Sequence, residues 1–211
     1  VIYDRAIDCV KPSDEKTLNA LIERLKGVDQ VIFVGGISPR LEGEELPISV
    51  DGFRGGDRTT IALPEVQTEL MKKMKEAGLP VIFVMMTGSA LGIEWESQNI
   101  PAILNAWYGG QFAGQAIADV LFGDYNPSGK LPVTFYRSDS DLPPFGAFSM
   151  ANRTYRYFKG EALYPFGFGL SYTMFDYSVP QVVSGGKVGE PIKVSVKVKN
   201  IGKKNGDEVV Q

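Results

Sequence analysis

Helical and strand patterns of apolar residues alternate along the first half of the chain. Apolar positions recur at helical spacing in three segments, residues 13–27, 64–77 and 113–121. Continuous apolar runs of strand length lie between them, at residues 31–34, 81–86 and 100–107. This alternation predicts an α/β fold, with a mainly parallel sheet flanked by helices in an α/β sandwich.

The first helix carries signals for both of its ends. Ser13 is the expected N-cap, Asp14 and Glu15 suit the positive end of the helix dipole, and Gly27 suits the C-terminal stop. The run at residues 31–34 is apolar at every position. We therefore expect a parallel strand that is covered on both faces.

The sequence changes character twice in its second half. Residues 124–172 are rich in proline, glycine and aromatic residues, which predicts a long, irregular but ordered segment. Residues 192–199 alternate between apolar and polar, and turn signals follow at residues 200–206. We expect two domains, an α/β sandwich over residues 1–178 and the beginning of a truncated β-sandwich domain over residues 179–211.

Composition excludes several kinds of chemistry. The net charge is −3 and no apolar run approaches the roughly 20 residues of a membrane span, so neither nucleic acid nor a membrane is an expected partner. The chain has no histidine, which excludes Ser/His/Asp and Cys/His catalytic systems and histidine metal sites. Cys9 is its only cysteine, so a cysteine-zinc cluster is excluded as well. Acid–base chemistry near neutral pH therefore has to rest on carboxylates.

A 29-residue connection, residues 35–63, follows the first predicted strand. It carries three glutamates within four positions (Glu42, Glu44 and Glu45) and two arginines, Arg40 and Arg54. Ligands in open α/β sheets bind beyond the carboxyl ends of the strands, and connections of this length are frequently functional. Repulsion among neighbouring carboxylates favours a protonated carboxyl, which a general acid in sugar hydrolysis must be. The spacing alone is also compatible with a solvated acidic turn.

Long motifs occur in a fixed order over residues 31–175. They are the segments 56–58, 61–64, 102–110, 118–124, 126–135, 155–158 and 164–175. Together they resemble the second domain of the family 3 glycoside hydrolases, the β-glucosidases and β-xylosidases. The C-terminal residues resemble the fibronectin-III-like module that follows this domain in many members.

The resemblance implies that the chain is part of a retaining, exo-acting β-glycosidase that removes terminal β-linked sugars from plant-type oligosaccharides. A (β/α)8 barrel of the parent chain would carry the nucleophilic aspartate, and this domain would supply the acid/base glutamate. Gly43-Glu44 is the nearest match to the family's Gly-Glu-Gly-aromatic loop, although Glu45 and Leu46 stand where glycine and an aromatic residue are common. Glu44 is therefore the expected acid/base.

Other residues of the connection have alternative roles. Glu42 and Glu45 are rivals for the acid/base, and with Arg40 and Arg54 they are the expected substrate-binding residues. Asp57 and Arg58 are expected to form a structural ion pair that pins the connection. Trp107 and Tyr108 are expected to be buried at a strand end rather than stacked on a sugar.

The implied partners are an oligosaccharide or β-glycoside substrate and the barrel, without which the fragment is expected to be inactive. The chemistry needs no metal or organic cofactor. We expect a periplasmic or secreted location. The main alternative is a non-catalytic structural or sugar-binding domain that supports a catalytic barrel.

Overall fold

The computed structural model describes residues 1–43, 45–183 and 186–211, which divide into two compact units. Unit 1 comprises residues 1–113 and 133–166, and unit 2 comprises residues 114–132 and 167–211. Within the described residues, no helix is long and apolar enough to cross a membrane.

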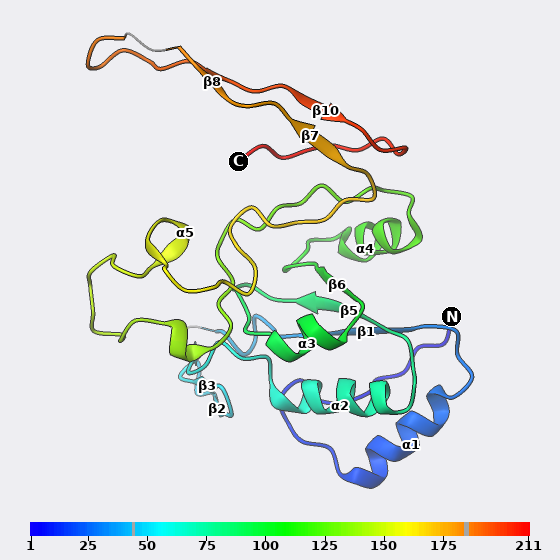
Figure 1. The fold of residues 1–211 in the computed structure, drawn as a ribbon. Coiled ribbons are helices and arrows are strands. Elements are labelled where there is room, and N and C mark those ends of the chain that lie inside the picture. Colours follow the sequence, from blue (N-terminus) through cyan, green and yellow to red (C-terminus); the bar gives the residue numbers. More distant parts are fainter. Residues whose placement is uncertain (44, 184–185) are drawn as a thin grey trace. The chain divides into compact units, whose positions relative to one another are not determined.

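Unit 1 is built on a three-stranded parallel sheet (Figure 1). Its strands are β1 (Val31–Gly36), β5 (Val81–Met86) and β6 (Ala102–Asn105), in the order β1-β5-β6. The register places Phe33 beside Phe83, and their rings stack with centroids 5.7 Å apart. All three strands therefore end at the same edge of the sheet.

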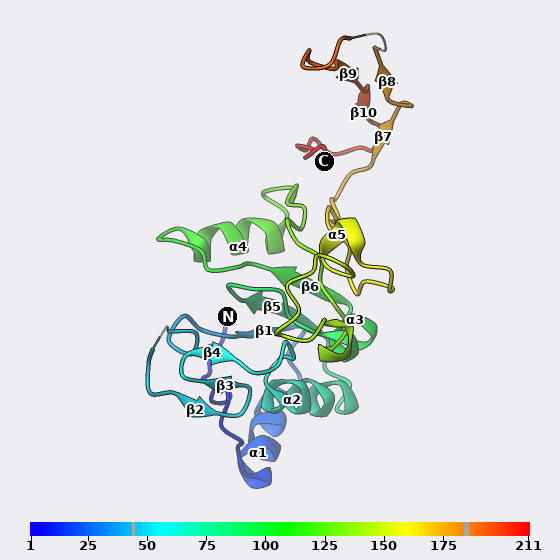
Figure 2. The ribbon, with the colours of Figure 1, turned by 90° about the vertical axis from the view of Figure 1, so that its left-hand side faces the viewer.

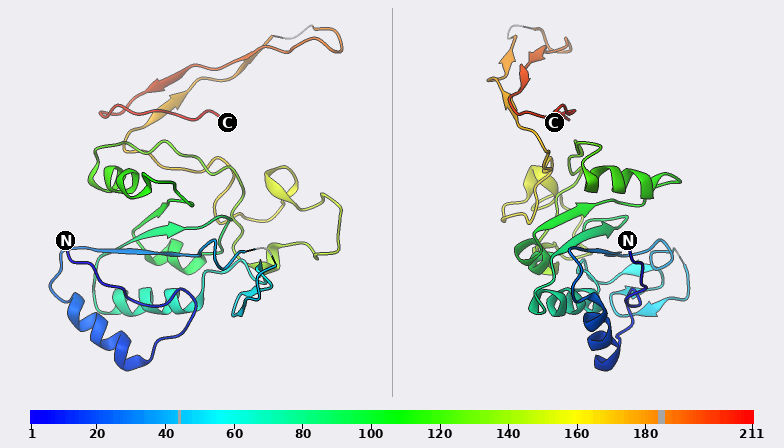
Figure 3. Two further views of the ribbon diagram at one scale, coloured as in Figure 1. Left: turned by 180° about the vertical axis from the view of Figure 1, so that it is seen from behind. Right: turned by 90° about the vertical axis from the view of Figure 1, so that its right-hand side faces the viewer.

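Three helices lie on one side of this sheet (Figures 1 and 2; Figure 3 shows the same arrangement from behind). They are α1 (Glu15–Leu25), α2 (Glu65–Glu76) and α3 (Glu94–Asn99). Helix α2 connects β1 to β5 and buries Leu70, Met71 and Met74 completely or nearly so. The prediction of a parallel sheet flanked by helices is confirmed.

The two longest strands differ in how they are covered. In β5, Phe83 and Val84 are both fully buried although they face opposite sides, as a continuous apolar run predicts. In β1 only the face of Phe33 is covered, while Ile32 and Val34 are 44% and 60% exposed. The expectation of burial on both faces is wrong for β1, because the helices of unit 1 pack on the Phe33 side.

The first helix starts one residue later than expected. The N-cap is Asp14, whose carboxylate accepts hydrogen bonds from the backbone N–H of Thr17 at 2.8 Å and from its hydroxyl at 2.9 Å. Ser13 is not the cap. An aspartate carboxylate accepts both bonds at once and also suits the positive helix end, which explains the shift.

Short elements in unit 1 have no counterpart among the predictions. Within the long connection, β2 (Ser49–Val50), β3 (Phe53–Arg54) and β4 (Asp57–Arg58) form a small antiparallel sheet. The six-residue α3 follows β5 and precedes β6 along the chain. Later in the chain come a 3-10 turn, Asp139–Asp141, and the short helix α5 (Thr154–Tyr157). Strands of two residues and helices of one or two turns are too short to show a period.

Most of α4 (Ala113–Phe122) belongs to unit 2 and matches the predicted third helix. The alternating C-terminal residues form antiparallel pairs rather than one continuous strand. The pairs are β7 (Phe175–Tyr177) with β10 (Val198–Asn200), and β8 (Gln181–Val182) with β9 (Val194–Ser195). The fibronectin-III-like assignment and the boundary at residue 178 stay predictions.

Candidate active site

The carboxyl edge of the parallel sheet gathers the segments that follow its strands. The long connection leaves β1 at Gly36, a tight turn of Thr87, Gly88 and Ser89 leaves β5, and Trp107 and Tyr108 follow β6. Thr87 stabilises its turn by accepting the Ser89 N–H at 3.1 Å and donating to the Ser89 carbonyl at 2.6 Å. This edge is where open α/β sheets bind ligands.

Glu42 joins these three segments. One of its carboxylate oxygens, Oε2, accepts a hydrogen bond from the Tyr108 hydroxyl at 2.8 Å. The other, Oε1, accepts one from the Ser89 hydroxyl at 3.1 Å. All three side chains are half-buried, so these bonds are less exposed to competition from water than surface contacts.

Arg58, at the end of β4, extends the cluster. Its Nη1 donates to Ser89 Oγ at 2.9 Å and to the Ala90 carbonyl at 3.0 Å, and its Nε donates to the Thr60 carbonyl at 3.1 Å. Burial lowers the pKa of the guanidinium, and the nearby negative charge of Glu42 works in the opposite direction. Nη2 is buried and has no partner among the described residues. Arg58 therefore fixes the connection to the turn after β5.

The expected Asp57–Arg58 ion pair does not fix the connection. Asp57 is exposed, and the ion pairs within the described ranges include none with Arg58. Successive residues of a strand point to opposite faces, so the two side chains of β4 diverge. The prediction is right that Arg58 pins the connection and wrong about its partner.

Tyr108 is held in place from two sides. A Cβ at Gly88 would lie 2.7 Å from Tyr108 Cε2 and 3.2 Å from Glu42 Oε2, so only glycine leaves room for this ring. The preceding Trp107 has a left-handed φ of 52° and packs edge-on against Phe135 at 6.2 Å. Trp107 and Tyr108 are both half-buried, rather than buried as expected. Burial and the hydrogen bond to Glu42 raise the pKa of Tyr108, which keeps its hydroxyl protonated and donating at neutral pH.

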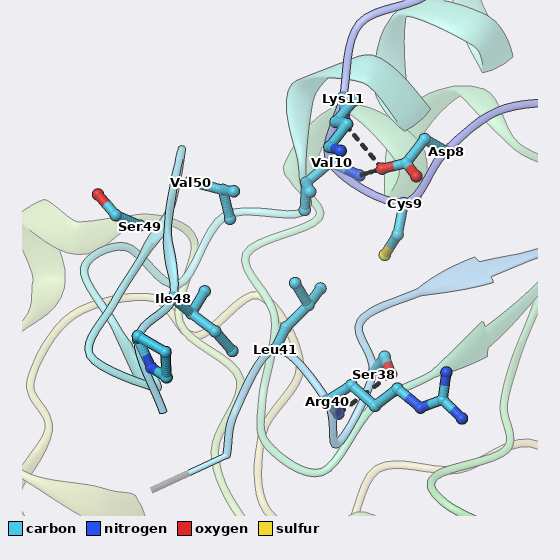
Figure 4. Close-up of a pocket in the computed structure, with 11 residues that line it drawn as sticks. Asp8, Cys9, Val10, Lys11, Ser38, Arg40, Leu41, Ile48, Ser49 and Val50 are labelled. Carbon is cyan, nitrogen blue, oxygen red and sulfur yellow. Dashed lines mark hydrogen bonds between the residues drawn. The ribbon is translucent and has the colours of Figure 1, made fainter. Parts of the chain in front are cut away.

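An open pocket of about 490 Å³ lies beside the same connection (Figure 4). Its lining mixes apolar residues such as Val10, Leu41 and Ile48 with polar ones such as Asp8 and Arg40. Figure 4 shows the Arg40 side chain extending away from Leu41 and Ile48. Asp8 accepts the backbone N–H groups of Val10 and Lys11, which lower the pKa of its carboxyl. The pocket therefore offers a charged carboxylate with partners already in place, and the described lining contains no second carboxylate for acid–base work.

Residues 5–172 match the family described as Glycosyl hydrolase family 3 C-terminal domain. The matched segment includes the whole parallel sheet and the connection that carries Glu42. The chain belongs to glycoside hydrolase family 3. The resemblance inferred from the sequence motifs is thereby confirmed.

The similar proteins include a β-xylosidase and β-glucosidases. A xylan 1,4-beta-xylosidase of Xylanibacter ruminicola is 53% identical over 190 residues, which cover 90% of this chain and 22% of that protein. A periplasmic beta-glucosidase of Salmonella typhimurium is 36% identical over 227 residues, which cover 100% of this chain and 28% of that protein. The crystal structure of a beta-glucosidase from Kluyveromyces marxianus has a TM-score of 0.75 at 28% identity, covering 92% of this chain and 23% of that one. The chain thus spans about a quarter of the length of these relatives.

Within this family 3 domain, the predicted site residues separate. Glu44 lies outside the described residues. Glu45 is exposed with a left-handed φ of 56°, and Arg40 and Arg54 are exposed. The hydrogen bonds and ion pairs of the described connection join Glu42 to none of these three residues. The structure brings together Glu42, Tyr108, Ser89 and Arg58 instead.

Sequence reasoning did not assign Ser89 to the site, and it gave Tyr108 and Arg58 other roles. The signal for Ser89 and Tyr108 was available, because each stands just after a predicted strand of a parallel sheet. Residues in those places share one edge. Arg58 had no such signal, since its position depends on the small sheet β2–β4.

Proposed function

We propose that the chain is the C-terminal part of a retaining, exo-acting β-glycosidase, a β-glucosidase or β-xylosidase acting on plant-type oligosaccharides. This domain would supply the acid/base glutamate and part of the sugar cleft. A (β/α)8 barrel of the parent chain would supply the nucleophilic aspartate. The observation that carries the proposal is the family 3 match of residues 5–172, with a glutamate-bearing connection leaving the carboxyl edge of the sheet.

Glu44 is the proposed acid/base. The family motif supports it, since Gly43-Glu44 is the nearest match in the connection. The contacts of its neighbours support it indirectly. Both carboxylate oxygens of Glu42 already accept hydroxyl hydrogen bonds. A general acid must instead present its proton to the glycosidic oxygen. Glu45, which is exposed, remains the second choice.

The proposed reaction runs in two steps. The aspartate attacks the anomeric carbon while the acid/base gives its proton to the departing oxygen, which leaves a covalent glycosyl-enzyme. The same glutamate, now a carboxylate, takes a proton from the water that releases the sugar with retained configuration. The two carboxyl groups must lie about 5–5.5 Å apart, so this connection has to face the barrel in the parent enzyme.

The test uses the full-length parent enzyme with Glu44→Gln and aryl β-xylosides and β-glucosides of different leaving groups. The 53% identical xylosidase makes xylosides the first choice. Removing a general acid should lower kcat/KM by about 10²- to 10⁴-fold for phenyl glycosides. It should have little effect for 2,4-dinitrophenyl glycosides, whose leaving group needs no proton. Glu45→Gln tests the second choice for the acid/base, and it should not show this dependence on the leaving group.

Wild-type rates for Glu44→Gln on both substrates would exclude it as the acid/base. If Glu42→Gln and Glu45→Gln also had no effect, the domain would be a structural or sugar-binding support for the barrel. We also propose a periplasmic or secreted location, as in the Salmonella relative. Fractionation of the source cells, with activity measured in each fraction, checks this.

A further inference from the structure

Glu42 is better placed as an anchor than as a sugar ligand. Its donors Ser89 and Tyr108 are 47 and 66 residues away in sequence, on the segments that follow β5 and β6. A carboxylate that already accepts a hydroxyl on each oxygen has part of its accepting capacity in use. A sugar hydroxyl would have to compete with donors that the fold already holds in place.

Arg58 determines which atoms donate and which accept in the hydrogen bonds that lead to Glu42. Arginine has only donors, so Ser89 Oγ must accept from Nη1 at 2.9 Å. The Ser89 proton is then free to point at Glu42 Oε1. The Tyr108 proton points at Oε2, and Gly88 leaves the space that its ring needs. The chain of donors ends on one acceptor, the Glu42 carboxylate.

The backbone around this chain is also secured. Thr87 is fully buried and closes the Ser89 turn with its own hydroxyl. On the other side, Asp139 accepts the Thr60 hydroxyl at 2.6 Å and the Ile61 N–H at 2.8 Å, just beyond the carbonyl that Arg58 Nε holds. Arg58 and Ser89 therefore stand on segments with little freedom to move. Hydrogen-bond donors on a backbone with little freedom to move fix the position of the acceptor that they bind.

We infer that Tyr108, Ser89 and Arg58 are positioning residues that fix the connection after β1 through the Glu42 carboxylate. Glu42 then acts as the anchor point of the connection rather than as a contact to substrate. This inference rests on the proposed function, because it assigns the four residues to the placement of that function's acid/base segment. A misplacement of about 1 Å at a catalytic group costs about 100-fold in rate.

The test compares leaving groups again, with Tyr108→Phe and Ser89→Ala in the full-length parent enzyme. Each change removes one donor to Glu42 and little volume. We expect kcat/KM for phenyl glycosides to fall about 10- to 100-fold and that for 2,4-dinitrophenyl glycosides to fall less than about 3-fold. Ser89→Thr keeps a hydroxyl, so its kcat/KM for phenyl glycosides should stay close to the wild-type value. Tyr3→Phe, at a residue 89% exposed, is the matched control and should leave both values unchanged.

Two results would overturn the inference while leaving the proposed function intact. In the first, Glu44→Gln shows the leaving-group dependence, but Tyr108→Phe and Ser89→Ala match the wild type or lose both substrates equally. In the second, Glu42→Gln alone shows the full dependence expected of an acid/base, which would make Glu42 the reacting group. If none of Glu42, Glu44 and Glu45 gives leaving-group dependence when changed to Gln, the proposed function itself fails. Thermal unfolding of each variant shows whether an equal loss on both substrates comes from unfolding.

Discussion

Gln67 on α2 ties the start of the long connection after β1 to the helix layer. It is 2% exposed, and its amide oxygen accepts the Gly36 N–H at 2.7 Å. Its amide nitrogen donates to the Gly36 carbonyl at 2.7 Å and to the Cys9 carbonyl at 2.9 Å. Gly36 is the last residue of β1, so one side chain holds the point where the connection leaves the sheet.

Gln67→Met removes these three hydrogen bonds and keeps most of the side-chain volume. Glutamine and methionine have similar helix propensities, so the helix itself should be unaffected. At about 1 kcal/mol net for each bond, the free energy of unfolding should fall by about 3 kcal/mol. The same substitution at the exposed Gln115 should change it by less than about 0.5 kcal/mol.

Urea unfolding followed by tryptophan fluorescence measures this difference. The two tryptophans of the chain, Trp95 and Trp107, both belong to unit 1, as does Gln67. With an unfolding slope of about 2 kcal/mol/M, the midpoint should shift by about 1.5 M urea. Equal midpoints for Gln67→Met and Gln115→Met would refute the reasoning, because the buried bonds would then contribute nothing.

Two further variants test local geometry. Gly36→Ala places a Cβ against the Met86 carbonyl oxygen at a φ of 110°, so the free energy of unfolding in urea should fall by more than about 2 kcal/mol. A Cβ at Gly110 meets nothing within 4 Å, so Gly110→Ala should be nearly neutral. Equal losses for the two variants would argue against the close approach at Gly36. Asp14→Ala removes the α1 cap. The hydrogen bonds from Thr17 lower the pKa of Asp14 in the folded state. The cap therefore stabilises fully above the unfolded pKa of about 3.9 and loses its effect as pH falls through the lower folded pKa. The gap in melting temperature between wild type and Asp14→Ala should be constant from pH 5 to 8 and shrink below about pH 4, and a pH-independent gap contradicts this.

The fold was predictable where an element was long and buried. The run at residues 81–86 and the amphipathic α2 have enough residues to show their period, and both form as expected. The covering of β1 was not predictable, because Ile32 and Val34 are as apolar as Phe33 and only packing distinguishes their two faces. The six polar-rich residues of α3 and the two-residue strands of the connection lack any periodic signal.

The sequence predicted where the site lies in the fold, but it did not predict which side chains contact one another there. The position of a long connection after β1 pointed to the carboxyl edge of the sheet. The partners of Glu42 are set by tertiary distances: Tyr108 reaches it only because Gly88 lacks a side chain and Trp107 turns the backbone through a left-handed conformation. The spacing of residues within the connection contains no information about the Gly88 contact or the Trp107 backbone.

The central claim is that a carboxyl group of this connection handles the proton in both steps of a retaining reaction. Azide tests it directly, because this anion attacks the glycosyl-enzyme without needing a base. With Glu44→Gln in the full-length enzyme and an activated aryl xyloside or glucoside, azide should raise turnover and yield the glycosyl azide with the β configuration, visible by NMR. An unchanged rate and free sugar as the sole product would contradict the account.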